Sequence, residues 1–161
     1  MSQTLVNPPG TAAGSLVLQR VFAAPPEIVF AAWSDPEHVA TWWHPKEFAT
    51  PVFEMDFRVG GSFRYCIRSE RHEGWAHGVY REIDRPRRIV FSFQWEGEGG
   101  LAAPDPETLV TLTFEARGDD TLLTFRQEPF ASDAARHSHG QGWHQVLEHL
   151  DAFLAARKVA S

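Results

Sequence analysis

The chain alternates apolar and polar residues through Phe53–Arg68, whose sequence is FEMDFRVGGSFRYCIR. A period of two residues is typical of β-strands, and a glycine pair between two such runs indicates a hairpin. We therefore predict two antiparallel strands, joined near Gly60–Gly61, that share one apolar face. The side chains expected on that face are Phe53, Met55, Phe57, Phe63, Tyr65 and Ile67.

The register of this hairpin follows from the rule that directly opposed residues share one face of a sheet. A two-residue loop would place Asp56 opposite Tyr65 and mix polar with apolar side chains. A three-residue loop, Val59–Gly61, pairs Met55 with Tyr65 and keeps one face apolar. We predict this register, with Gly61 in the left-handed conformation that such loops require.

Outward from the hairpin, five more segments have the short apolar or alternating runs of strands. Between two of them, the glycine- and proline-rich segment Gly97–Pro106 predicts a long flexible loop. Together with the hairpin, these segments predict a sheet of about seven strands. The five are Leu16–Phe22, Trp75–Ile83, Ile89–Trp95, Thr108–Ala116 and Thr121–Gln127.

Two short helices are expected after the first strand. Pro25 and Pro26 suit the start of a helix, where a missing N–H costs nothing. Asp35 can cap a second helix that begins at Pro36 and stops before Pro45.

A long helix is predicted over residues 132–158, capped by Ser132 or Asp133. Gly140 and Gly142 weaken it by roughly 1 kcal/mol each relative to alanine. They predict either a break or close backbone packing at this point. Apolar residues recur at three- and four-residue spacing, which indicates one buried stripe: Trp143, Val146, Leu147, Leu150, Phe153 and Leu154.

An aromatic sheet face cannot remain in water, so the one long helix must cover it. The predicted fold is therefore α+β, with a curved antiparallel sheet wrapped around a long C-terminal helix. We expect a flexible leader over residues 1–14 and a single domain over residues 15–158.

Six local motifs occur along the chain, in the order Ala24–Phe30, Trp33–Glu37, Trp42–Trp43, Asp56–Gly61, Gly78–Ile83 and Gly142–Trp143. In this order they resemble the START-like (SRPBCC) superfamily, whose fold is the helix grip. The last four are similar to the branch named for the C-terminal domain of the heat-shock-protein-ninety ATPase activator. The resemblance covers residues 16–157 and implies that fold firmly.

The same resemblance implies several functions. Members of the superfamily bind lipids, hormones or polyketides, assist a chaperone, or catalyse cyclisation and dehydration. A shared fold does not choose among these, so the site must decide.

The predicted site lies where the concave sheet face meets the helices, because this fold places its cavity there. Large aromatic side chains could line an open cavity or fill it as a core, and the sequence leaves both alternatives open. The candidate ligand-binding residues are Trp43, Phe53, Met55, Phe63, Tyr65, Trp75, His77, Phe91, Phe93, Trp95, Phe125 and Trp143.

Two polar residues in this set could orient a ligand. His77 alternates with Trp75 and Val79 and is expected on the inner face, as is Tyr65. Arg81 would share that face unless a bulge intervenes. We assign no catalytic residue and no cofactor.

Composition excludes several other classes. The net charge of −6 and the absence of a basic stripe argue against nucleic-acid binding. The one cysteine, Cys66, allows no internal disulfide. No metal-ligand spacing, signal peptide or membrane span occurs, so we expect a cytoplasmic protein without a metal.

The function expected from these observations is non-catalytic binding of a hydrophobic small molecule, lipid-like or aromatic. One alternative is an enzyme resembling polyketide cyclases and dehydratases that uses the same cavity. Another is a chaperone-linked or other protein-binding module, and a homodimer is possible.

Overall fold

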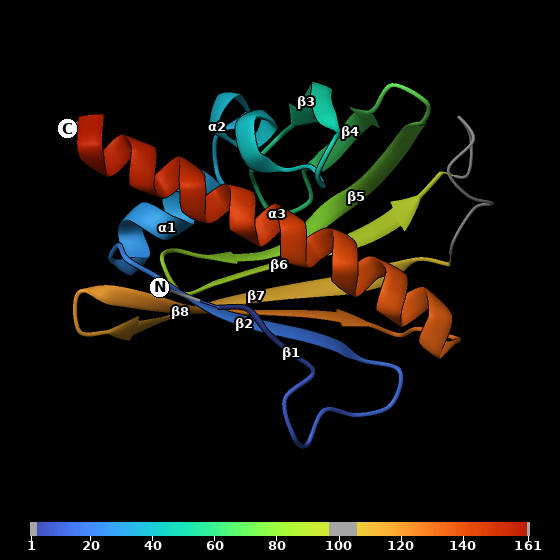
Figure 1. Cartoon of the computed structure of the whole chain (residues 1–161), viewed down its shortest axis with the longest axis horizontal. Helices are drawn as coiled ribbons and strands as arrows, with labels where there is room; N and C mark the ends of the chain where they lie inside the picture. The colour runs from blue at the N-terminus through green and yellow to red at the C-terminus, as the bar shows by residue number, and fades with distance from the viewer. Residues whose placement is uncertain (1–2, 97–105, 161) are drawn as a thin grey trace.

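The computed structural model describes residues 3–96 and 106–160, with side chains as far as residue 157. This part of the chain forms one antiparallel sheet with the strand order β1-β2-β8-β7-β6-β5-β4-β3 and three helices (Figure 1). The predicted loop over residues 97–106 falls, except for its last residue, outside the described residues. The elements are β1 (Leu5–Val6), β2 (Leu16–Phe22), α1 (Pro26–Ala32), α2 (Pro36–Trp42), β3 (Ala49–Met55), β4 (Ser62–Arg68), β5 (Glu73–Asp84), β6 (Arg88–Trp95), β7 (Thr108–Arg117), β8 (Asp120–Glu128) and α3 (Asp133–Ala160).

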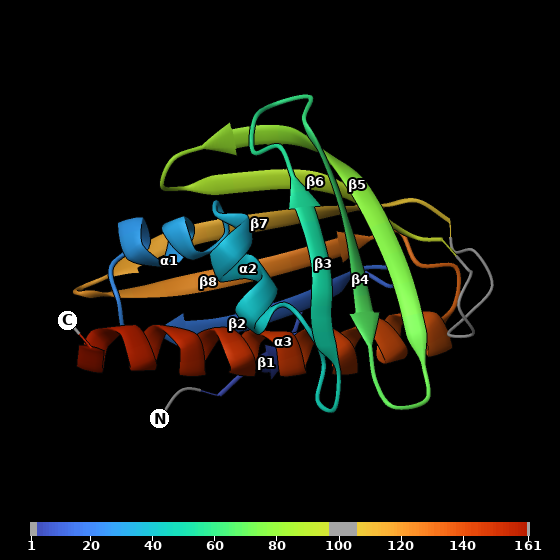
Figure 2. The ribbon, with the colours of Figure 1, turned by 90° about the horizontal axis from the view of Figure 1, so that it is seen from above.

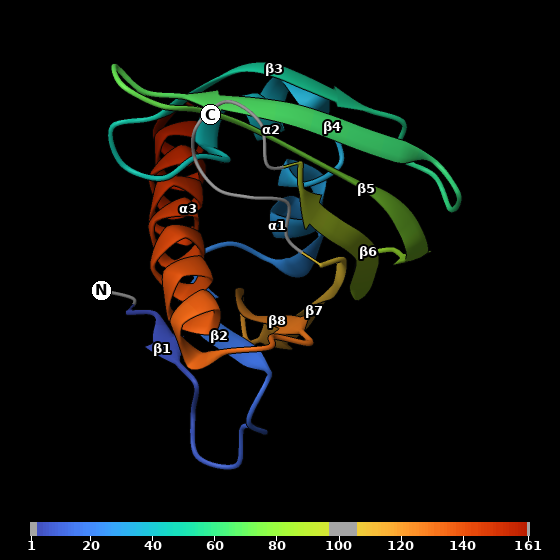
Figure 3. The same cartoon turned by 90° about the vertical axis from the view of Figure 1, so that its right-hand side faces the viewer.

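The sheet curves around the helices. Viewed from the end, it forms an arc from β3 through β5, β6 and β7 to β2, and α3 lies across the open side (Figure 3). Strands β2, β7 and β8 run roughly along α3, whereas β3, β4 and β5 cross it (Figure 2). The predicted helix-grip arrangement, with two short helices after the first long strand, is confirmed.

The sheet has eight strands, one more than predicted, and the additional strand lies in the expected leader. Leu5 and Val6 pair with β2 as strand β1. Asn7 then fastens this segment: its side-chain Oδ1 accepts a hydrogen bond of 3.0 Å from the Val17 N–H. Two residues are too short to show a period, so the sequence pattern carries no signal for this strand.

The predicted helix starts are confirmed at the level of individual hydrogen bonds. Asp35 accepts from the N–H of Glu37 at 2.9 Å and caps α2. The hydroxyl of Ser132 accepts from the N–H of Ala135 at 3.1 Å and caps α3. Each cap satisfies a backbone donor that has no partner within the helix.

The predicted hairpin register is wrong by two residues. Met55 pairs with Phe63 rather than with Tyr65. A shift of two residues leaves every side chain on its own face, so the apolar pattern could not distinguish the two registers. Gly60, and not Gly61, has the positive φ of 86°.

Helix α3 is continuous through both glycines, so the predicted break does not occur. Gly140 packs closely instead: a Cβ there would lie 3.1 Å from Leu16 Cδ1, whereas a Cβ at Gly142 would meet nothing within 4 Å. Among the described residues, no helix is both long and apolar enough to cross a membrane.

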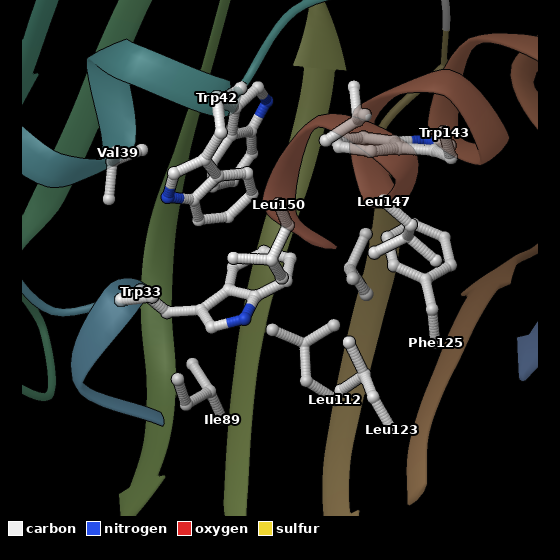
Figure 4. Packing of buried hydrophobic residues seen from close by; sticks show 14 of the residues in the cluster. Trp33, Val39, Trp42, Ile89, Leu112, Leu123, Phe125, Trp143, Leu147 and Leu150 are labelled. Carbon is white, nitrogen blue, oxygen red and sulfur yellow. The ribbon is translucent and has the colours of Figure 1, made fainter. Parts of the chain in front are cut away.

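The core lies between α3, the short helices and the inner sheet face. Figure 4 shows Trp143, Leu147 and Leu150 of α3 directed toward the sheet and toward the side chains of Trp33 and Trp42. Trp42, Leu147 and Leu150 are fully buried. The apolar stripe predicted for the long helix is therefore the face of α3 that packs against the sheet.

A partly buried ion pair fastens α3 to β2. The guanidinium of Arg20, only 8% exposed as a residue, donates to Asp151 Oδ2 at 2.6 and 3.2 Å. Arg20 also donates to the hydroxyl of Thr4 at 2.9 Å. Because a buried charge needs such partners, this pair restricts how α3 can lie on the sheet.

Gly78→Ala tests the close approach of β5 to its neighbours. A Cβ at Gly78 would lie 1.8 Å from the Ser92 carbonyl oxygen and 2.6 Å from the Phe63 ring. We expect a loss of about 3 kcal/mol in the free energy of unfolding, measured by urea denaturation. Gly142→Ala is the control and should stabilise by about 0.5–1 kcal/mol, because it improves helix propensity without a clash. Equal effects of the two variants would contradict this account.

Candidate binding cavity

A cavity of about 340 Å³ lies between the first half of α3 and the inner face of the sheet. Strands β4 and β6 supply side chains from the sheet, and the connection between α2 and β3 closes a third side. The walls are predominantly apolar. The lining residues are Trp43, Pro45, Phe48, Tyr65, Ile67, Trp95, Ala135, Ser138, His139, Gly142, Trp143 and Val146.

Four of the predicted site residues meet here: Trp43, Tyr65, Trp95 and Trp143. The ring centroids of Trp43 and Tyr65 are 5.5 Å apart, and those of Tyr65 and Trp95 are 6.0 Å apart. Trp143 lies 5.5 Å from Trp43 on the helix side. The four rings therefore form one continuous aromatic wall.

The other predicted residues of the inner face pack into or against the core beside this wall. Phe125 and Phe93, for example, lie 4.8 and 5.3 Å from the Trp143 ring. The sequence left open whether the aromatic side chains line a cavity or fill a core. The structure shows both, because one part of the interior is filled and another is hollow. The residues that pack in this way are Phe53, Met55, Phe63, Phe91, Phe93 and Phe125.

The prediction that Trp75 and His77 face the interior is wrong. Both lie on the outer face of β5, and the His77 side chain is 46% exposed. The rings of neighbouring strands occupy the space over β5, and the Phe63 ring leaves no room even for a Cβ at position 78. Small residues and one tyrosine therefore face inward from β5, namely Gly74, Ala76, Gly78 and Tyr80.

His77 belongs to a polar cluster on the outer face. Arg64 donates two hydrogen bonds of 2.8 Å to the carboxylate of Glu96, and His77 Nδ1 lies 3.0 Å from Glu96 Oε2. The guanidinium of Arg64 also lies 4.2 Å from the centroid of the Trp75 ring. Arg64, with His77, holds the pKa of Glu96 at about 2. Arg81 is exposed as well, next to a register shift in β5.

Sequence reasoning missed eight lining residues. Ala135, Ser138 and Gly142 follow one another at helical spacing, and their small size leaves the cavity beside α3 empty. Small residues at helical spacing, opposite an aromatic sheet face, could have indicated a cavity. A search for stripes of large apolar residues does not detect them. Pro45 and Phe48 lie in a connection without periodicity. The others missed are Ile67, His139 and Val146.

Trp143 is held in place by a buried hydrogen-bond chain. Its indole N–H donates to Gln127 Oε1 at 2.8 Å, and Gln127 Nε2 donates to the Thr108 hydroxyl at 2.8 Å. Thr108 in turn donates to the carbonyl of Phe93 at 3.0 Å. Gln127 is fully buried, so this chain sets the orientation of the ring that forms one wall of the cavity.

Tyr65 brings a polar group into the cavity. The residue is only 2% exposed, and its hydroxyl donates no hydrogen bond within the described part of the chain. Burial raises the pKa of Tyr65 far above its usual value, and the neighbouring Trp43 indole N–H opposes that rise. The Trp43 N–H is itself buried and makes no hydrogen bond of normal geometry. The phenol is therefore neutral at physiological pH.

The rim of the cavity is more polar than its interior. Ser138 is exposed and His139 is half-buried. His139 Nδ1 lies 2.9 Å from the carbonyl oxygen of Ala135, and its ring lies 5.0 Å from that of Phe130. These contacts fix the imidazole at the edge rather than inside the cavity.

A second hollow, about 760 Å³, lies between the N-terminal segment and the start of α3. It is larger, but its described lining includes Asp133, Arg136 and His137 and contains no phenylalanine, tyrosine or tryptophan. Apolar ligands favour enclosed aromatic walls. We therefore take the aromatic cavity as the candidate site.

Comparisons with known proteins agree with this architecture. A family model described as activator of Hsp90 ATPase homolog 1-like protein matches residues 23–155. A protein from Chromobacterium violaceum is 30% identical, with a TM-score of 0.76 over 86% of this chain and 95% of that one. A protein from Rhodobacter sphaeroides is 26% identical, with a TM-score of 0.79 over 96% of this chain and 99% of that one. No curated protein matches the chain.

Gln127→Leu tests the hydrogen-bond chain that holds Trp143. We expect a loss of about 2–3 kcal/mol in the free energy of unfolding, because leucine leaves a buried indole N–H without an acceptor. In the double variant Gln127→Leu/Trp143→Phe that N–H is absent, so the combined loss should fall below the sum of the single losses. Strict additivity in urea denaturation would show that the bond does not hold the ring.

Proposed function

The chain belongs to the family of activator of Hsp90 ATPase homolog 1-like proteins, and we propose that it binds a hydrophobic small molecule in the cavity beside α3. Binding in this proposal is non-catalytic. The observation that carries it is the aromatic wall of Trp43, Tyr65, Trp95 and Trp143 around a space that no described side chain fills.

The dimensions of the cavity favour a small ligand. Ligand sites in proteins commonly measure about 300–1,000 Å³, and this one, at about 340 Å³, is near the lower end. Burial of apolar ligand surface supplies roughly 25 cal/mol per Å². About 150 Å² of buried ligand surface would therefore contribute close to 4 kcal/mol before the costs of association.

The polar groups support binding better than catalysis. A cyclase or dehydratase needs acid–base groups that face each other across its cavity. In the described interior, the Tyr65 hydroxyl is a neutral phenol with a raised pKa, and Ser138 and His139 lie at the rim. His77, which the sequence favoured as a polar partner, lies outside.

A protein-binding role finds less support. The most exposed large apolar side chains come from four separate parts of the structure, which are β1, α1, the β3–β4 loop and β7. A docking surface usually gathers such residues into one patch. Within the described residues these are Leu5, Val6, Ile28, Val59 and Leu109.

Gly142→Leu tests the proposal by filling the cavity. Gly142 lines the cavity and a Cβ there meets no atom within 4 Å, so leucine can enter the space without disturbing the helix. We expect an environment-sensitive apolar dye such as Nile red to bind the native protein at one site. Its Kd should rise at least tenfold in Gly142→Leu, while the Tm stays the same or increases.

Two controls accompany this titration. Gln141→Leu adds the same side chain at the neighbouring exposed position, and His77→Ala removes the outer-face imidazole. Both variants should bind the dye as the native protein does. Absence of dye binding to the native protein, or equal binding by Gly142→Leu, would refute the proposal.

A further inference from the structure

The hydroxyl of Tyr65 distinguishes this cavity from a purely apolar hollow. Buried polar groups nearly always have hydrogen-bond partners, because an unpaired one costs about 1–3 kcal/mol. Tyr65 is only 2% exposed and lines the cavity, and its O–H donates to no acceptor within the described residues. This O–H can therefore donate to an acceptor held in the cavity.

We propose, on the premise that the cavity is a binding site, that its ligand is a neutral planar aromatic compound whose carbonyl oxygen accepts a hydrogen bond from Tyr65. The phenol O–H is the donor, and the ligand oxygen is the acceptor. One hydrogen bond from Tyr65, within an otherwise apolar site, would thus orient the ligand.

The neighbouring Trp43 supports an acceptor on the ligand. Its buried indole N–H can only donate, it has no hydrogen bond of normal geometry, and it acts on the Tyr65 hydroxyl oxygen. An oxygen that accepts a hydrogen bond gives up electron density to the donor, so its own O–H becomes a stronger donor. The pair is therefore arranged to present an O–H to the cavity rather than to accept from it.

The lining supports a neutral ligand. No lysine or arginine occurs among the described residues that line the cavity, and the imidazole of His139 lies at its rim. A carboxylate taken into this space would lose its hydration without gaining a cationic partner, which is strongly unfavourable. A ketone, ester or amide carbonyl places a hydrogen-bond acceptor at Tyr65 without that cost.

The arrangement of the cavity walls favours a planar ligand. Trp43 and Trp143 meet edge to face at 68° with centroids 5.5 Å apart, and Tyr65 and Trp95 meet at 63° with centroids 6.0 Å apart. Flat rigid rings on several sides favour a flat ligand that stacks or meets them edge-on. A flexible chain would lose rotational freedom on entering the same space.

Three matched probes separate these features. 2-Acetylnaphthalene has the carbonyl, 2-isopropenylnaphthalene replaces that oxygen by a methylene of nearly the same shape, and 2-naphthoate carries a charge. Their affinities are measured by displacement of Nile red from the full chain. We expect the ketone to bind native protein five- to tenfold more tightly than the alkene, as one neutral hydrogen bond implies, and the naphthoate to bind most weakly.

Tyr65→Phe removes the donor and keeps the ring. This variant should bind the ketone and the alkene with equal affinity, while its affinity for the alkene stays at the native value. Tyr80→Phe is the matched control, because Tyr80 is a buried tyrosine of the inner face that does not line the cavity. It should keep the native preference for the ketone.

The outcomes separate this inference from the proposed function. If Nile red and all three probes fail to bind, both are wrong. If ketone and alkene bind the native protein equally, or if Tyr65→Phe keeps the ketone preference, the carbonyl assignment is wrong and apolar binding stands. If the naphthoate binds as tightly as the ketone, the ligand is not restricted to neutral compounds. The comparison of probes on native protein holds even where a variant folds poorly.

Discussion

Covering an aromatic sheet face with one helix is the constraint on which the rest of this structure depends. Strands β4, β6 and β8 direct large rings inward, and water contact with that face would be costly. Helix α3 is the one long element available among the described residues, and the ion pair between Arg20 and Asp151 fastens it to the sheet. The two short helices then close the space that α3 does not reach.

The cavity forms because the two halves of α3 present side chains of different size to the inner face of the sheet. The second half of α3 carries Leu147 and Leu150, which are fully buried against the core. Its first half carries Ala135 and Gly142, which are too small to reach the sheet. The large rings cannot collapse into the gap, because the hydrogen-bond chain through Gln127 fixes Trp143. The sizes of the side chains on the two halves of α3 therefore decide where the interior is filled and where it is hollow.

The mistaken predictions have one common origin. Alternation assigns residues to two faces, but it does not say which face is inner when neighbouring side chains compete for the same space. In β5 the Phe63 ring occupies that space, so glycines and an alanine face inward and His77 faces outward. The hairpin register failed for a related reason, since a two-residue shift preserves both faces.

The sequence by itself determined the elements, because periods of two and 3.6 residues, proline positions and caps such as Asp35 and Ser132 act over a few residues. It also determined that an aromatic face would need a helical cover. Only the tertiary structure decided which rings pack and which line a cavity. That choice depends on contacts between residues far apart in the chain, such as Trp43 with Trp143 and Trp143 with Gln127, whose distances no local pattern contains.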